Sequence, residues 1–570
     1  MKRALTILTM VLVVVIEIHG QSAKGQTYCN PMNLSYGFSI DQPSRREASD
    51  PTIVLFKENY FLFASKAGGY WHSNNLTDWK LVTPTALPLE KQAPTAVVIG
   101  DWMYFFTSLT DTIFRSNDPA NGKWEIYNSD FHLSMVSDVA VFADTDGRVF
   151  CYYGCSNHDG LMARELDVNN KLNPKGVPEV CQLKNLSGLG WKRTTNDLKR
   201  AYIPGAEGSW MNKYNGKYYY QCSEPDTEFK TLIDVVYISD SPLGPFTYAS
   251  QNPFSLKPTG FVTGTSRGST FADKHGNWWH VATLSSKEKQ ASEPRLGLFP
   301  SFFDDEGNLV TYTGFGDYPL IMPNHKYTDV SELNPGWALL SFQKSAEASS
   351  SLASTPVANA FDENIATYWS SKIGNPGEWL SVDLGSTCTI HAIQVNFAQH
   401  KTILKSREGI QGQQYLVEYS DDKINWKPLT DKTANTDDLT HPYEVMSTPV
   451  QARYVKITNH CVPDGTFAIS GFRVFGLGKV PSPTKVTTFF AIKDRHDPGM
   501  IKLSLGKPTA HSTGYNIRYG TQKDKLYHNY QVYENTPVIF RGLDKKKKYW
   551  FEIDAFGEGG VTPSIAHPSH

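Results

Sequence analysis

The sequence has no long hydrophobic run after its first twenty residues and no excess of charge of either sign. Because no later segment approaches 18 consecutive apolar residues, we expect no membrane-spanning helix in the rest of the chain. The 55 basic and 57 acidic side chains give a net charge of −2, which removes the electrostatic basis for binding nucleic acid or an anionic membrane. Sustained helical periodicity is also missing, so the sequence favours a fold built of strands.

Cysteines are few, and their odd number, seven, leaves at least one thiol outside any intramolecular disulfide. A chain of 570 residues does not need disulfides to fold, so we expect these side chains to be buried small hydrophobes. The start of the chain indicates the compartment, because Lys2 and Arg3 precede a nearly continuous apolar run over residues 4–16. Residues 1–20 are therefore predicted to be a signal peptide, and the protein to be secreted or periplasmic.

Aromatic residues make up 13% of the chain, and many of them lie in a repeated unit between residues 50 and 320. Five times a short apolar strand, a turn and an aromatic strand follow one another, as at Asp146-Gly and Asn215-Gly. The turns recur every 43 to 69 residues or so, which fits one four-stranded sheet per repeat. We predict an all-β chain with a five-bladed β-propeller over residues 27–339. A two-sheet sandwich is the alternative, but it would not explain five similar units.

The repeats also align five residues at the starts of their first strands. In a propeller these strands line the central axis and start at one end, so the five residues should ring one mouth of the funnel. They are Asp50, Gln92, Asp138, Glu207 and Arg267. A single acid before a strand is usually a turn residue, whereas three in one register position indicate a function. Crowded carboxylates raise the pKa of one member, which suits acid–base chemistry.

Three motifs that contain these acids resemble glycoside hydrolase family 43: Ser49-Asp-Pro-Thr-Ile-Val, Ser137-Asp-Val-Ala-Val-Phe and Glu207-Gly-Ser-Trp-Met. The resemblance implies that Asp50 is the general base, that Glu207 is the general acid, and that Asp138 orients the acid and tunes its pKa. It also implies inverting hydrolysis, with the two carboxyl groups about 6.5–9.5 Å apart, and no cofactor for catalysis. The expected activities are α-L-arabinofuranosidase or β-xylosidase, with galactose release as a further activity of this scaffold.

Three residues are predicted to bind the polysaccharide substrate. Gln92 replaces an aromatic residue that is frequent in the family, and Arg295 falls where the family often has an arginine that faces the substrate. Arg267 stands where the family often has a histidine associated with a central ion or water site. Two hypotheses remain open for Arg267: a counter-charge that keeps Asp50 ionised, or a residue that recognises carboxylates of acidic glycans.

Two further domains are predicted, and residues 345–355 are predicted to be a linker or a loop. Residues 340–477 resemble a discoidin (coagulation-factor type C) domain, similar to carbohydrate-binding modules of family 32, through Ala360-Phe-Asp-Glu-Asn-Ile-Ala-Thr and Glu378-Trp-Leu-Ser-Val-Asp-Leu-Gly. This resemblance implies a structural Ca²⁺ held by oxygen ligands, and an ordinary polar loop is the alternative. The candidate ligands are Asp362, Asn364 and Thr367.

Residues 484–567 resemble a fibronectin type III domain through Gly514-Tyr-Asn-Ile-Arg-Tyr-Gly, and we expect a spacer. Taken together, the sequence predicts a glycosidase with an attached sugar-binding module. The alternative is a catalytically silent carbohydrate-binding protein on the same scaffold. An adhesion protein is a third possibility, but it leaves the three carboxylates unexplained.

Overall fold

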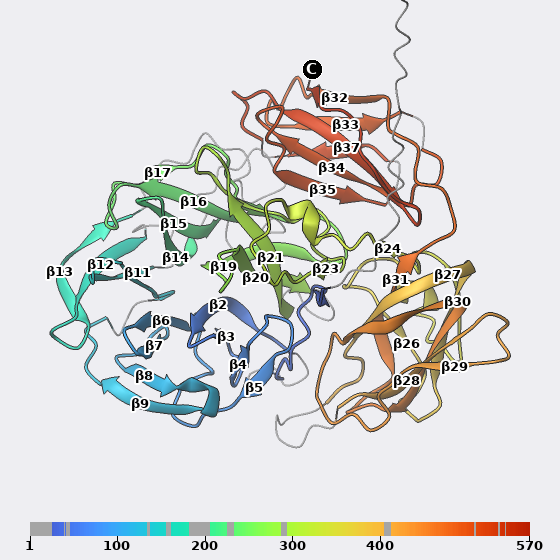
Figure 1. The fold of residues 1–570 in the computed structure, drawn as a ribbon, viewed down its shortest axis with the longest axis horizontal. Coiled ribbons are helices and arrows are strands. Elements are labelled where there is room, and N and C mark those ends of the chain that lie inside the picture. The colour runs from blue at the N-terminus through green and yellow to red at the C-terminus, as the bar shows by residue number, and fades with distance from the viewer. Residues whose placement is uncertain are drawn as a thin grey trace, which may run out of the picture.

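A computed structural model gives the structure of the chain (Figure 1). It describes residues 25–38, 40, 46–133, 137–154, 161–181, 206–224, 233–286, 293–403, 412–506, 509–533, 536–541 and 543–569. The predicted signal peptide and Cys155 lie outside these ranges. The other six cysteines form no disulfide with one another. Among the helices in the described ranges, none has the length and hydrophobicity needed to cross a bilayer.

The first part of the chain folds into five antiparallel sheets, one for each repeat of the sequence. In each sheet the strands lie side by side in the order of the chain. The strands are β2 (Ser49–Phe56), β3 (Asn59–Ser65), β4 (Tyr70–Ser73) and β5 (Lys80–Val82); β6 (Thr95–Ile99), β7 (Trp102–Phe106), β8 (Ile113–Asp118) and β9 (Lys123–Asn128); β10 (Ala140–Ala143), β11 (Val149–Tyr153), β12 (Met162–Asp167) and β13 (Asn173–Val180); β14 (Glu207–Tyr214), β15 (Lys217–Glu224), β16 (Ile233–Ser239) and β17 (Thr247–Tyr248); β19 (Thr263–Ala272), β20 (Trp278–Ser286), β21 (Glu293–Phe303) and β22 (Leu309–Thr311). Strand β18 (Ser255–Leu256) also pairs with β16.

The five sheets close into a ring. The first strand of each sheet contacts the first strands of two others, in the cycle β2, β6, β10, β14, β19 and back to β2. Figure 1 shows the sheets following one another from blue to green around this cycle. The predicted all-β class is confirmed, and the ring places the starts of five equivalent strands around one axis.

Turn chemistry and aromatic packing explain these sheets. At the β14–β15 turn, Asn215 and Gly216 both have positive φ angles (46° and 78°), as the tight hairpin turns that match strand twist require. Between the first two sheets, Phe63 packs against Tyr70, with ring centroids 4.8 Å apart, and against Phe105 at 5.5 Å. Aromatic pairs at such distances add stability beyond that of their buried area, so the aromatic strands fill the space between sheets.

A second sheet system follows along the chain and includes the first part of the predicted linker or loop. Residues 345–355 contain β25 (Ser345–Ala348), which pairs with β27 (Trp379–Phe397). Exposed and half-buried residues alternate along β25, so its polar composition is that of an edge strand rather than of a linker. The other strands of this sheet are β24 (Ala338–Leu339), β26 (Trp369–Ser370), β28 (Gln414–Ser420), β29 (Lys427–Asp431), β30 (Tyr443–Cys461) and β31 (Ala468–Leu477).

The last part of the chain forms two sheets around one core. The first sheet contains β32 (Phe489–Lys493), β33 (Ile501–Leu505) and β36 (Val538–Phe540). The second contains β34 (Gly514–Gly520), β35 (His528–Val532), β37 (Trp550–Gly557), β38 (Gly560–Thr562) and β39 (His567–Pro568). Residues from both sheets, among them Leu503, Ile517 and Ile553, are fully buried in the shared core, so this region is a β-sandwich.

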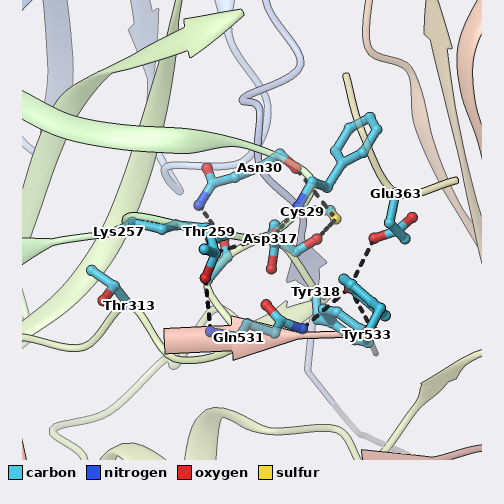
Figure 2. A network of polar contacts seen from close by, with 12 residues as sticks. Cys29, Asn30, Lys257, Thr259, Thr313, Asp317, Tyr318, Glu363, Gln531 and Tyr533 are labelled. Carbon is cyan, nitrogen blue, oxygen red and sulfur yellow. Dashed lines mark hydrogen bonds and ion pairs between the residues drawn. The ribbon is translucent and has the colours of Figure 1, made fainter. Parts of the chain in front are cut away.

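A buried polar network joins the three parts (Figure 2). Arg473 on β31 pairs with Glu363 at 2.9 Å, with side chains 1% and 3% exposed, and donates a hydrogen bond to the backbone oxygen of Asp317 beside the ring of sheets. Tyr533, from the C-terminal sandwich, donates to Glu363 at 3.3 Å and also contacts Tyr318. A buried ion pair requires such additional hydrogen bonds, so all three parts are needed to complete this network.

Candidate active site

The five sheets share one unusual backbone position at the starts of their first strands. Asp50, Ala93, Asp138, Gly208 and Arg267 have positive φ angles between 48° and 69°. Four of the five are not glycine, and non-glycine residues adopt this conformation only at a cost in energy. Such strain persists where the surrounding structure enforces it, frequently at functional sites. The repeated φ angle therefore identifies the equivalent residues of the five sheets.

This register corrects the sequence alignment at two of the five positions. Gln92 and Glu207 each lie one residue before the equivalent position, which Ala93 and Gly208 occupy. At Glu207 the offset coincides with a bulge, because the pairing of β14 with β15 shifts between Glu207 and Trp210. Bulges redirect side chains at the edges of sheets and beside active sites. Glu207 therefore reaches the same cluster from a different backbone position.

Three carboxylates gather around one arginine, and we call Asp50, Asp138, Glu207 and Arg267 the charged cluster. The Arg267 Nε donates to Glu207 Oε1 at 2.6 Å, and a terminal nitrogen of the same guanidinium contacts the same oxygen. The other terminal nitrogen lies 3.4 Å from Asp50 Oδ1. The three acids raise the pKa of Arg267, which stays charged. Its shortest contacts are to Glu207, so its counter-charge role is not confined to Asp50.

Hydroxyl groups fix the Asp50 carboxylate. Its Oδ2 accepts hydrogen bonds from Ser49 at 2.9 Å and from Ser65 at 2.5 Å. The Ser65 hydroxyl also accepts the backbone N–H of Ala93 at 2.7 Å, which ties the first sheet to the second. The backbone N–H of Asp50 donates to Thr283 on the fifth sheet at 3.0 Å. Three sheets therefore hold Asp50 in one orientation, with Oδ1 toward Arg267.

The pKa of the Asp138 carboxyl group is strongly shifted from its usual value. Burial, followed by the charges of Asp50 and Glu207, raises its pKa from 3.8 to about 7, although Arg267 and the backbone N–H of Gly208 act in the opposite direction. That N–H donates to Asp138 Oδ2 at 3.1 Å. Asp138 is thus tied to the residue after Glu207, and it retains a proton up to about neutral pH.

The raised pKa predicts that Asp138 destabilises the fold at high pH. The folded state holds this proton up to about pH 7 and the unfolded state only up to about pH 3.8, so stability falls as pH rises between these values. Asp138→Asn removes this penalty and should raise the free energy of unfolding at pH 8 by about 2 kcal/mol, with a smaller gain at pH 5.

Denaturant unfolding at both pH values measures this effect. Asp101→Asn, at the exposed β6–β7 turn, is the matched control and should change nothing with pH. A gain for Asp138→Asn that is the same at pH 5 and pH 8, or a loss of stability at pH 8, would contradict the assignment.

The described residues form the floor of a site that is open to solvent. A small cavity of about 30 Å³ lies between Asp50, Asp138 and Arg267, with Trp210 in its wall. A cavity of this size has room for water. Sequence reasoning missed Trp210, although it lies in the Glu207-Gly-Ser-Trp motif. Its half-buried ring offers an apolar face beside the acids.

Two of the predicted substrate-binding residues lie outside the charged cluster. The side chain of Gln92 is exposed, and Ala93 lines the cavity instead. Arg295 is 0% exposed; its Nε donates to His441 at 2.9 Å and a terminal nitrogen donates to Glu293 at 3.1 Å. Because His441 belongs to the second sheet system, Arg295 is part of the contact between two domains. The structure therefore does not bring Arg295 to the site.

The predicted calcium ligands lie together in one loop. Thr367 Oγ1 is 2.6 Å from Asp362 Oδ2 and 3.0 Å from the backbone oxygen of Asn364. The Asn364 side-chain oxygen instead accepts the backbone N–H of Ala366. Burial raises the pKa of Asp362. The oxygen atoms of Asp362 and Thr367 and the Asn364 backbone thus fit part of a Ca²⁺ coordination shell.

Comparison with known proteins identifies two regions. Residues 43–297 match the profile of glycosyl hydrolases family 43, and residues 345–466 match the F5/8 type C domain. The chain contains a glycosyl hydrolase family 43 domain. It is a glycosidase, and the charged cluster lies within the matched region.

Three individual proteins are similar to parts of this chain. "Xylosidase/arabinosidase 43A" of Humicola insolens is 29% identical over 247 residues, which are 37% of this chain and 70% of that enzyme. "Beta-xylosidase" of Xylanibacter ruminicola is 28% identical over 186 residues, which are 28% of this chain and 50% of that enzyme. A solved structure titled "Glycoside hydrolase" has a TM-score of 0.46 and 15% identity, and the match covers 77% of this chain and 99% of that chain. The matches to the two enzymes extend over at most 37% of this chain.

Proposed function

We propose that this glycosidase removes terminal arabinofuranosyl or xylosyl residues from plant polysaccharides, with inversion at the anomeric carbon. The observation that carries the proposal is the single guanidinium of Arg267 that stands between Asp50 and Glu207. It contacts both carboxylates, so a base and an acid lie at one site, as inverting hydrolysis requires. The names of the two related enzymes support the sugar class.

In this proposal each acid has a separate role. Asp50 takes a proton from the attacking water, and its serine hydrogen bonds aim Oδ1 into the site. Glu207, which is buried and only 6% exposed, protonates the leaving oxygen. Asp138 stays at the backbone of Gly208 and exchanges its proton near neutral pH, so it supports the protonated form of Glu207 as pH rises. Trp210 supplies a ring face for the sugar.

The domain assignments belong to the same proposal. The ring of five sheets is proposed to be a five-bladed propeller and the catalytic domain, over residues 27–339. Residues 340–477 are proposed to bind carbohydrate, and residues 484–567 are proposed to be a fibronectin type III spacer. We also propose that the protein is exported. A catalytically silent carbohydrate-binding protein remains the second candidate, although it leaves the strained and hydrogen-bonded acids without a purpose.

A panel of aryl glycosides tests the function. The panel should contain α-L-arabinofuranosides, β-xylosides, β-galactosides and a β-glucuronide, the last of which tests recognition of acidic sugars by Arg267. We expect hydrolysis of the first two classes, and NMR of the fresh product should show the inverted anomer. No release from any member or from arabinoxylan would favour the silent carbohydrate-binding protein. A preference for the glucuronide would favour the recognition role of Arg267.

We further propose that Asp362, Thr367 and the backbone of Asn364 hold a Ca²⁺ ion. At about 10 mM, Ca²⁺ should stabilise the protein by about 2.7 kcal/mol if the dissociation constant is near 0.1 mM, as in extracellular modules. Thermal unfolding with Ca²⁺, with Mg²⁺ and with a chelator measures the effect. Asp362→Ala should abolish the gain from Ca²⁺. An identical melting temperature in Ca²⁺ and in chelator would show that the segment is an ordinary polar loop.

A further inference from the structure

A buried polar pair lies directly behind the charged cluster. Asp234 on β16 and His280 on β20 are 2% and 0% exposed, and Asp234 Oδ2 lies 3.0 Å from His280 Nε2. Neither residue belongs to the charged cluster. Both lie inside strands, in different sheets of the ring, so their contact joins the fourth sheet to the fifth.

The carboxylate of Asp234 holds the backbone of Arg267 in place. Its Oδ1 accepts the backbone N–H of Arg267 at 3.0 Å and the hydroxyl of Ser223 at 2.5 Å. Its Oδ2 accepts the backbone N–H of Gly268 at 3.1 Å. Arg267 is in the left-handed region, at φ 49°, where a non-glycine residue stays only if its surroundings enforce it. Asp234 supplies that enforcement through two consecutive N–H groups.

His280 supports the same turn from below. A side chain at Gly268 would place its Cβ 2.5 Å from His280 Cε1 and 2.4 Å from the backbone oxygen of Val281. Glycine is therefore required at this position because the imidazole lies against the backbone. The ring is fixed on its other side by Phe254, whose centroid is 5.1 Å away.

A chain of hydrogen bonds fixes where the protons of this pair lie. The backbone oxygen of Thr270 can only accept, so Asn212 presents its amide nitrogen to it at 2.8 Å. The oxygen of Asn212 then accepts from the Gln221 amide at 2.6 Å, and the oxygen of Gln221 accepts from the Thr270 hydroxyl at 2.7 Å. That hydroxyl has no second proton, so at 3.0 Å it accepts one from His280 Nδ1.

With a proton on Nδ1, His280 needs a second proton toward Asp234. Without it, the lone pair of Nε2 would face a carboxylate oxygen at 3.0 Å, which is repulsive. The Asp234–His280 pair therefore holds this additional proton and has no net charge. Because the pair is neutral overall, Asp234 can accept the two backbone N–H groups beside the acids without adding a fourth negative charge to the site.

We infer that Asp234 and His280 are positioning residues for catalysis: they clamp the strained turn at Arg267 and Gly268, and so aim the Arg267 guanidinium at Glu207 and Asp50. This inference rests on the proposed function of the charged cluster. The guanidinium belongs to a residue whose backbone is held by this clamp. Loosening the turn should therefore shift the contacts of the guanidinium with both acids.

The test compares Asp234→Asn with Asp273→Asn. Asp273 is also buried and also accepts four hydrogen bonds, from the backbone of His275, from the backbone and side chain of Asn277, and from Trp279. It lies just after β19, at the far end of this strand from the charged cluster. Both variants should therefore lose stability, but Asp234→Asn alone should lower kcat, by about 10² or less, with little change in KM.

A second measurement separates positioning from a structural effect. The Arg267 guanidinium contacts Glu207, the proposed acid, and a neighbouring positive charge favours the ionised form of a carboxyl group, so a displaced guanidinium should move the basic limb of the pH–rate profile upward in Asp234→Asn and not in Asp273→Asn. If Asp234→Asn does not fold, Ser223→Ala replaces it. The Ser223 hydroxyl bonds both Asp234 and the backbone of Arg267, so we expect a smaller loss in the same direction.

The outcomes separate the two proposals. Equal kcat and equal pH profiles for Asp234→Asn and Asp273→Asn, with an active wild type, would overturn the positioning role and leave the glycosidase proposal intact. If the wild type hydrolyses no substrate, the NMR signal of Arg267 Nε–H tests the positioning role instead. We expect it to weaken in Asp234→Asn because its hydrogen bond to Glu207 is lost. An unchanged signal would overturn the inference.

Discussion

Asp50→Asn should lower kcat by about 10²–10⁴-fold, the usual contribution of a general base. An amide has almost the shape of a carboxylate and can still accept the hydrogen bond of Ser65, so the left-handed turn at Asp50 should survive. What is lost is the ability to take a proton from water. The measurement is the initial rate on the best substrate of the glycoside panel, together with a melting curve that shows an intact fold.

The control for Asp50→Asn is a substitution that alters the hydrogen bonds of the Asp50 carboxylate but keeps the carboxylate itself. Ser49→Ala removes one of the two hydroxyl donors to Asp50 Oδ2 but leaves the carboxylate, and we expect a loss of about tenfold or less, near the worth of one hydrogen bond. Near-wild-type turnover by Asp50→Asn on a true substrate would show that the base lies elsewhere. Equal losses in both variants would assign Asp50 a positioning role.

The sequence predicts the five sheets well because each contains a local signal. Positive φ angles occur at Asn215, Gly216 and Gly147, and the aromatic strands that follow these turns are buried along nearly their whole length. The three acids also emerge from counting back to the starts of the strands. Counting fails by one residue at Gln92 and Glu207, because the left-handed residue of each sheet is the next one, Ala93 or Gly208, and nothing in the composition marks this position.

Contacts between distant segments are what the sequence does not reveal. Arg295 lies on β21 of the fifth sheet, yet its Nε is hydrogen-bonded to His441, 146 residues away, so a resemblance between short motifs could not place it. Asp234 stands inside the apolar strand Ile233–Ser239, where a lone acid has no local explanation. It is explained by the backbone of Arg267 and by His280, which the ring closure brings to it.

Arg267 stands where the family often has a histidine, and its contacts in the structure bear on its role. The sequence offers a counter-charge for Asp50 or a site for acidic glycans. In the structure the guanidinium makes its two short contacts with Glu207, the proposed acid. The two short contacts orient Glu207, and the longer one reaches Asp50, so a single side chain links the proposed acid with the proposed base.

The second large effect is expected for Glu207→Gln, and its size should depend on the leaving group. Glutamine keeps an oxygen that can accept from the Arg267 Nε, so the charged cluster should keep its geometry. It cannot donate a proton to the glycosidic oxygen. Xylo-oligosaccharides and arabinan, whose alkoxide leaving groups need that proton, should lose about 10²–10⁴-fold in kcat/KM. Dinitrophenyl glycosides, which leave as stable phenolates, should lose less than about tenfold, because the general acid contributes little to their departure.

The measurement is a plot of log kcat/KM against the pKa of the leaving phenol for the wild type, Glu207→Gln and Asp50→Asn. Glu207→Gln should give a steep negative slope, because charge now accumulates on the departing oxygen. Asp50→Asn is the matched control: it should lower every point by a similar factor, since the base acts on water and not on the leaving group. The basic limb of the wild-type pH profile should also flatten in Glu207→Gln, because no acid remains to be deprotonated. Parallel slopes for the two variants would remove Glu207 from the role of acid and leave Asp138, with its pKa of about 7, as the group that donates the proton.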